Sequence, residues 1–160
     1  MFKLGKKSRE RLETCTPDLQ LIIQSAIMRS SVDFGISQGA RTFEKQLDYF
    51  TQGKSKLDPR KPESLARAMH VITEDRPLAL AVDIYAYHPV YEVRKKIAYD
   101  IGSLCYIAGV IQSTAVELYG IGLVKHLVRW GGNWDKDAVI LHDQSFDDLP
   151  HFELYKPRQC

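Results

Sequence analysis

The segment Val90–Leu118 constrains the fold more than any other part of the chain. Its apolar residues recur at alternating spacings of four and three, which is the period of one face of an α-helix. The residues on that face are Val93, Ile97, Ile101, Leu104, Ala108, Ile111, Ala115 and Leu118. The pattern predicts one long helix, ended by Gly120 and Gly122, whose apolar face must be covered by the rest of the protein.

Shorter segments predict further helices and strands. One helix is expected over Pro17–Ser30, with proline in its first turn, and another begins after Thr42, carries an apolar stripe and ends at Gly53. The stripe consists of Phe43, Leu47 and Phe50. Alternating apolar and polar residues predict strands at Phe34–Gln38, Leu78–Tyr87, Leu127–Trp130 and Pro150–Tyr155. Lys54–Arg76 has no clear period and is predicted to be a long loop with a turn of helix near Leu65.

The order of these elements, with helices first and then strands around one long helix, is typical of an α+β fold. A chain of 160 residues can bury a core without disulfides. We therefore expect a small antiparallel sheet packed against helices, in a single domain over residues 1–160 with no separate binding domain.

Composition excludes several classes of protein. The 22 Lys and Arg against 20 Asp and Glu leave a net charge of +2, without the basic field of a nucleic-acid binder. No uninterrupted apolar run approaches the roughly 18 residues of a membrane span. The N-terminal residues are charged and lack the apolar stretch of a secretory signal, so no such signal is expected. The three cysteines, with no CxxC pair, indicate reduced thiols and synthesis in a cytoplasm.

Three polar side chains are candidate metal ligands: His70 in the long loop, Asp83 on its strand and His151 on the last strand. Two imidazoles and one carboxylate would give a zinc ion three protein ligands and leave a fourth position for water. The chain has five histidines and 20 acidic residues, so many such triples arise by chance. Spacing alone therefore leaves open that both histidines are ordinary loop and strand residues.

Two more residues are candidates for catalysis. Asp148, three residues before His151, could take a proton from water and pass it to a leaving amine. Asp147 and Glu153 are alternative bases, since Glu153 shares a strand face with His151. Arg41 could stabilise negative charge or hold a substrate carboxylate, although many arginines only face solvent.

Several motifs occur in order over almost the whole chain. They are Phe2–Ser8, Pro17–Leu19, Asp33–Phe34, Gln38–Thr42, His70, Ala81–Ile84, Arg129–Trp134 and Asp148–Glu153. Together they resemble the bacteriophage L-alanyl-D-glutamate peptidases, which are endolysins within the wider VanY-like family of D-alanyl-D-alanine carboxypeptidases and dipeptidases. Gln38–Thr42 is similar to the QGxRT motif of that family, and the resemblance implies a hedgehog/DD-peptidase-like fold.

The resemblance implies a role for each candidate. Zinc would be held by His70, Asp83 and His151, Asp148 would be the general base, and Arg41 would stabilise charge on the substrate.

The sequence departs from the family pattern between the first two ligands. The family places its aspartate seven residues after the first histidine, whereas Asp83 follows His70 by thirteen. An insertion of about six residues, over Ile72–Pro77, would restore the register, and Asp75 is the alternative carboxylate.

The function implied is a zinc metallopeptidase that hydrolyses a bond in the peptidoglycan stem during host cell lysis. A D-alanyl-D-alanine carboxypeptidase is one alternative, and an inactive zinc-holding module that binds the cell wall is another. The resemblance further implies a monomer made in the host cytoplasm, which reaches the wall in the periplasm through a separate holin. His88, His126 and His142 are not expected to bind zinc, and whether Asp135, Asp137 and Asp143 hold a second cation stays open.

Overall fold

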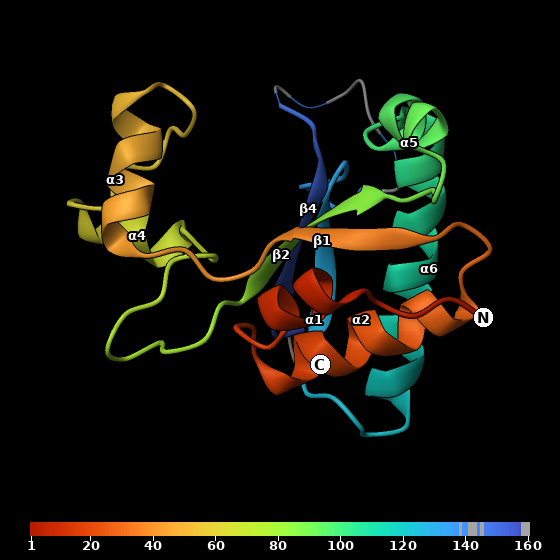
Figure 1. The fold of residues 1–160 in the computed structure, drawn as a ribbon. Coiled ribbons are helices and arrows are strands. Elements are labelled where there is room, and N and C mark those ends of the chain that lie inside the picture. The colour runs from red at the N-terminus through yellow and green to blue at the C-terminus, as the bar shows by residue number, and fades with distance from the viewer. Residues whose placement is uncertain (138, 141–143, 145, 158–160) are drawn as a thin grey trace.

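The computed structural model describes residues 1–137, 139–140, 144 and 146–157 (Figure 1). Its helices are α1 (Lys6–Leu12), α2 (Pro17–Arg29), α3 (Phe43–Thr51), α4 (Pro62–Arg67), α5 (Tyr91–Ile97) and α6 (Ile101–Gly120). Its strands are β1 (Phe34–Gln38), β2 (Ala81–Ala86), β3 (Leu127–Gly131) and β4 (Asp148–Tyr155). The strands form one four-stranded sheet in the order β1-β2-β4-β3, and every pair is antiparallel. The predicted α+β class with a small antiparallel sheet is confirmed.

The two faces of the sheet differ in chemistry because successive side chains of a strand point in opposite directions. One face is apolar and packs against α6, which stands to the right of β4 in Figure 1. Its buried residues on the three strands that contact α6 are Val82, Ile84, Val128, Trp130, Phe152 and Leu154. The opposite face carries Asp83, Arg129, His151 and Glu153, so polar groups from three strands gather on one side.

The long helix predicted over Val90–Leu118 is wrong in one respect, since it is two helices with a break between Ile97 and Ile101. The carboxylate of Asp100 accepts a hydrogen bond from Ser103 N at 2.9 Å and caps α6. The carbonyl of Ala98 accepts from Ala86 N at 3.0 Å, at the end of β2. A local cap and a tertiary bond therefore stop a pattern whose apolar spacing continues without a break.

Helix α1 was not predicted from the sequence, and it covers the exposed edge of β1. Ser8 Oγ accepts a hydrogen bond from Ile36 N at 3.0 Å, and Arg11 Nη1 donates to Ile36 O at 2.6 Å. The main-chain N–H and C=O of Ile36 in the middle of β1 are satisfied in this way, which helps protect the strand edge from pairing with another chain.

Helices α3 and α4 lie together beyond the ends of β1 and β2, at the left of Figure 1. Thr42 caps α3 as predicted, since its Oγ1 accepts from Lys45 N. The apolar stripe predicted on α3 does not form its buried side: Phe43 is exposed and Gln46 is the buried residue. The turn of helix expected near Leu65 is α4.

Helix α6 is the one helix among the described residues that is long and apolar enough to cross a membrane by length and composition. Its apolar character has a simpler source, because it contacts α2 and three strands of the sheet. The residues buried in these contacts include Leu104, Ile107 and Ile111. A core helix passes the same length and composition test.

Candidate metal centre

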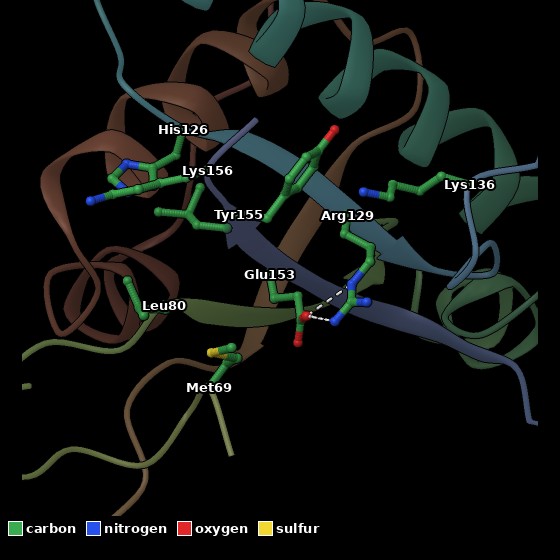
Figure 2. Close-up of a pocket in the computed structure, with 9 residues that line it drawn as sticks. Met69, Leu80, His126, Arg129, Lys136, Glu153, Tyr155 and Lys156 are labelled. Atoms are coloured by element: carbon green, nitrogen blue, oxygen red, sulfur yellow. Dashed lines mark hydrogen bonds and ion pairs between the residues drawn. The ribbon is translucent and has the colours of Figure 1, made fainter. Parts of the chain in front are cut away.

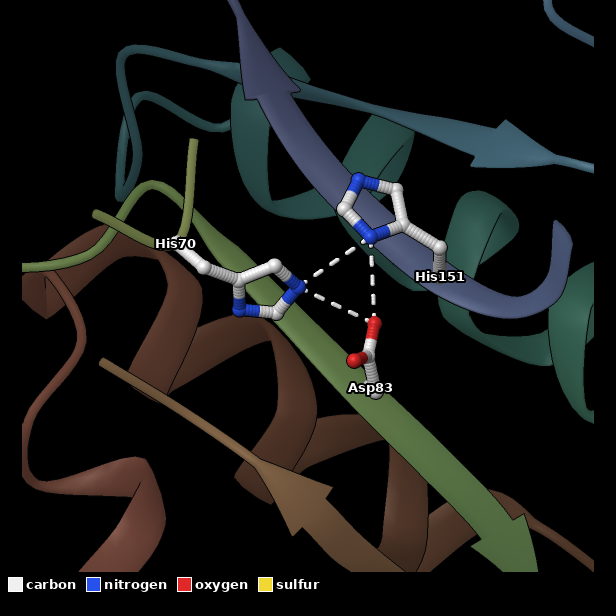
Figure 3. A group of neighbouring side chains, drawn as sticks. All are labelled: His70, Asp83 and His151. Carbon is white, nitrogen blue, oxygen red and sulfur yellow. Dashed lines mark hydrogen bonds and ion pairs between the residues drawn. The ribbon is translucent and has the colours of Figure 1, made fainter. Parts of the chain in front are cut away.

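The side chains of His70, Asp83 and His151 meet on the polar face of the sheet (Figure 3). Asp83 and His151 are direct cross-strand partners of β2 and β4, and His70 comes from the segment after α4. Asp83 Oδ1 lies 3.0 Å from both His70 Nε2 and His151 Nδ1, and these two nitrogens are 3.2 Å apart. One oxygen and two nitrogens thus converge on a single point.

The other nitrogen of each imidazole is held by a separate acceptor. His70 Nδ1 lies 2.8 Å from the carbonyl oxygen of Gly39, and His151 Nε2 lies 3.2 Å from Glu153 Oε2. A proton donated to each acceptor leaves the lone pair of His70 Nε2 and of His151 Nδ1 facing Asp83. Both rings are therefore oriented as ligands.

The charges at this point are strongly coupled. Burial on its own would raise the pKa of Asp83, but the charge and hydrogen bonds of His70 and His151 outweigh burial and hold that pKa far below its usual range. Burial would lower the pKa of His151, yet hydrogen bonds to Asp83 and Glu153 raise it to about 9. A cation is therefore favoured where the three side chains meet.

Glu153, an alternative general base from the sequence, is instead bonded to Arg129 and His151. Its carboxylate is buried, with 4% of the residue exposed, and Arg129 Nε donates to its Oε1 at 2.9 Å. Burial would raise the pKa of Glu153, but the hydrogen bonds from His151 and Arg129 outweigh it and lower the pKa. Trp134 ends a motif of the family resemblance but was given no role from the sequence; its ring centroid lies 5.4 Å from that of His151 and 5.2 Å from the guanidinium carbon of Arg129. The pair of Glu153 and Arg129 therefore supports His151.

Asp148 is the first residue of β4 and lies opposite Gly131 of β3. Burial raises the pKa of its carboxyl and outweighs the charge of His151, which lowers it; the charge of Asp83 raises the pKa further, and His70 and Arg41 have smaller lowering effects. A carboxyl with a raised pKa holds a proton more readily, which suits a group that accepts and returns one.

Arg41 is anchored from both sides of its guanidinium. Nη1 donates to Gln46 Oε1 at 2.8 Å, Nη2 donates to Gln38 Oε1 at 3.0 Å, and the guanidinium lies 4.6 Å from the ring centroid of Tyr49. Its buried Nε finds no partner among the described residues. The main chain of Arg41 also bonds the segment of the first ligand, since Arg41 N donates to His70 O at 2.8 Å.

Gln46 was missed because a single glutamine in a short helix carries no sequence signal. In the structure its Nε2 donates to Ser55 Oγ at 2.9 Å and to Leu57 O at 2.8 Å, so its oxygen is turned toward Arg41. The arginine is thus fixed in place by two of its five N–H donors, and three N–H groups are not used in these bonds.

The segment Ile72–Pro77 explains why Asp83, and not the alternative carboxylate Asp75, lies beside the two histidines. Thr73 and Arg76 bond each other through both main-chain groups, at 2.9 and 3.1 Å, and this turn carries Asp75 into solvent. The Arg76 side chain folds back and donates to the carbonyl of Ala68 at 2.9 Å. These residues form a turn that projects away from the site, so the chain on either side of it brings His70 and Asp83 together.

The remaining candidates lie elsewhere. His126 bonds Asp18 at 2.7 Å, and His88 Nδ1 accepts from Val90 N. Asp135 and Asp137 belong to no group of three metal-binding side chains among the described residues. His142 and Asp143 lie outside the described residues.

The chain is similar to known peptidases in sequence and in fold. A family model described as phage L-alanyl-D-glutamate peptidase matches residues 1–155. The L-alanyl-D-glutamate peptidase of Escherichia phage T5 is 38% identical over 65 residues, which are 40% of this chain and 47% of that protein. The matched stretch is therefore about half the length of the phage T5 protein. The crystal structure of the L-Ala D-Glu endopeptidase ChiX from Serratia marcescens has a similar fold, with a TM-score of 0.67 over 96% of this chain and 90% of that chain at 23% identity.

Proposed function

The chain belongs to the phage L-alanyl-D-glutamate peptidase family, and on that premise we propose that it is a zinc-dependent endopeptidase of bacterial peptidoglycan. The bond proposed for cleavage lies between L-alanine and D-glutamate of the stem peptide. The observation that carries the proposal is the convergence of three ligand atoms, on a buried point, beside Asp148 and Arg41.

The donor set fits zinc. Two imidazole nitrogens and one carboxylate oxygen are ligands that zinc takes in catalytic sites, and three protein ligands leave one position open. Both imidazoles have their second nitrogen held by an acceptor, as metal-binding histidines usually do. We therefore propose His70, Asp83 and His151 as the zinc ligands. When bound, zinc supplies a Lewis acid that polarises a carbonyl group and lowers the pKa of water.

Asp148 and Arg41 are proposed to carry out proton transfer and charge stabilisation. Asp148 acts as general base toward the attacking water and returns the proton to the leaving amine, for which its raised pKa is suited. Arg41 stabilises negative charge that develops on the substrate oxygen through the charge of its guanidinium. Gln38 and Gln46 hold the guanidinium in position before the substrate arrives.

The wider setting follows from the family. We propose a monomeric endolysin with one catalytic domain over residues 1–160. It would be made in the host cytoplasm and would reach the cell wall in the periplasm through a separate holin.

The proposal is tested with purified protein and isolated peptidoglycan. Parent protein should release new amino groups, and mass spectrometry should identify D-glutamate at the new N-terminus. Asp148→Asn keeps the shape of the side chain and should lower the rate by about 10²–10⁴-fold while the protein retains its zinc. Asp147→Asn is the matched control: Asp147 is the rival base, bonds only Gln144 among the described residues, and should leave the rate nearly unchanged.

Three outcomes would contradict the proposal. Release of free D-alanine would identify a carboxypeptidase. Binding to peptidoglycan without any new amino groups would identify an inactive wall-binding module. Full activity in metal-free protein would exclude the zinc mechanism.

A further inference from the structure

A pocket opens on the polar face of the sheet, next to the metal centre (Figure 2). Its volume is about 370 Å³. Glu153, which supports His151, forms part of its wall, and Tyr155 follows two residues further along β4. The pocket is therefore a continuation of the face on which the three candidate ligands meet.

The pocket has a surplus of positive charge. Arg129, Lys136 and Lys156 all line it, and Figure 2 shows them arranged around Tyr155. Glu153 is the one acidic residue in the described lining, and its carboxylate is already bonded to Arg129 and His151. The two lysines are therefore left without a carboxylate in the pocket, and an anion is the ligand that the charge favours.

The rest of the lining is apolar. Met69, Leu80 and Leu154 contribute to the wall, and the ring of Tyr155 lies 4.0 Å from Lys136 Nζ. A ligand that suits both parts is an organic anion with a short aliphatic portion, such as an amino acid side chain that ends in a carboxylate.

The position of the pocket matches the length of a bound peptide. A strand rises about 3.3 Å per residue, so Glu153 and Tyr155 lie about 7 and 13 Å beyond His151 along β4. An extended substrate laid along this face has a similar rise. A substrate residue two to four positions from the bond cleaved at the metal would reach the pocket.

We propose that this pocket is a subsite for a carboxylate of the stem peptide, two to four residues from the cleaved bond. The inference rests on the proposed function and adds a determinant of substrate choice to it. Lys136 and Lys156 supply the charge that recognises the carboxylate, and Arg129 is held in the wall by Glu153.

The test uses pairs of synthetic stem peptides that differ only in a free carboxylate or a carboxamide, placed two, three or four residues from the cleaved bond. For at least one pair, parent protein should cleave the carboxylate peptide with a KM about tenfold lower. The double variant Lys136→Met/Lys156→Met should lose most of this preference with kcat unchanged. The control Lys95→Met/Lys96→Met removes the same charge from α5, outside the pocket, and should keep the preference.

A binding measurement separates this inference from the proposed function. Calorimetric titration of the zinc-loaded Asp148→Asn protein with the same peptides reports recognition without catalysis, and a charge-based preference should weaken between 50 and 300 mM salt. If no peptide is cleaved but the carboxylate is still preferred in binding, the proposed function fails and the subsite stands. Equal KM and equal affinity for both peptides of every pair, or a preference unchanged in the double variant, would overturn the subsite.

Discussion

Gly131 is the position where one added methyl group should lower both the stability and the cleavage rate. It lies opposite Asp148, and a Cβ at Gly131 would stand 2.9 Å from the carbonyl carbon of Asp148, 3.0 Å from its Cβ and closer still to its carbonyl oxygen. Ordinary van der Waals contact begins near 3.4 Å, so the carbonyl carbon must retreat by about 0.5 Å (3.4 minus 2.9) and the oxygen by more. Catalytic groups tolerate about 0.5 Å of displacement.

Gly131→Ala should therefore lower the rate of peptidoglycan cleavage by about 10–100-fold. Overpacking should also cost about 1–3 kcal/mol of unfolding free energy. Cleavage rates, zinc content and urea unfolding together measure both effects.

Gly109→Ala in α6 is the matched control. A Cβ there meets nothing within 4 Å, and alanine should stabilise the helix by about 1 kcal/mol without changing the rate. A Gly131→Ala protein that cleaves within threefold of the parent rate would refute the reasoning that the main chain at this position holds Asp148 in place.

Three further predictions concern stability. Removing zinc with a chelator should lower the melting temperature by about 5–11 °C relative to free zinc at a hundred times its Kd, because that binding contributes about 2.7 kcal/mol; calorimetric scans with an equal midpoint would contradict zinc binding. Asp18 accepts from Lys125 N at 2.8 Å and from His126, and although burial opposes it these bonds lower its pKa from 3.8. Asp18→Asn should thus cost about 1 kcal/mol in urea unfolding at pH 7, a gap that shrinks as the pH falls below about 4 and the native carboxylate protonates. Ile111→Ala, at a fully buried site of α6, should cost about 2–5 kcal/mol, whereas Val116→Ala, 60% exposed on the same helix, should change the unfolding free energy by less than about 0.5 kcal/mol.

The elements with a strong local pattern were predictable from the sequence. The strand Phe34–Gln38 and the cap at Thr42 are confirmed, since alternation and capping act over a few residues. Helix α1 has only seven residues, with Ser8 and Leu12 buried, and so short a segment shows no period. The break before α6 was missed because Asp100 and the bond from Ala86 interrupt a helix whose apolar spacing runs on.

The same division holds at the candidate site. The residue types and the family resemblance indicated His70, Asp83 and His151, which the structure brings together. Their supports were not visible in the sequence. The carbonyl oxygen of Gly39 holds His70 from 31 residues away in the chain. Gln46 holds Arg41 from only five residues away, but its amide is oriented by bonds to Ser55 and Leu57, which depend on how the loop folds against α3.

The two imidazoles are held by acceptors of different kinds, and this has a consequence for how the site can change. The acceptor for His70 is a main-chain carbonyl, which no substitution at Gly39 removes, and a Cβ there would stand 3.0 Å from the carbonyl carbon of Arg11. The acceptor for His151 is the side chain of Glu153, which a single codon change can shorten, neutralise or delete. Single substitutions can therefore change the hydrogen bond that holds His151, whereas the hydrogen bond that holds His70 does not depend on the identity of a side chain.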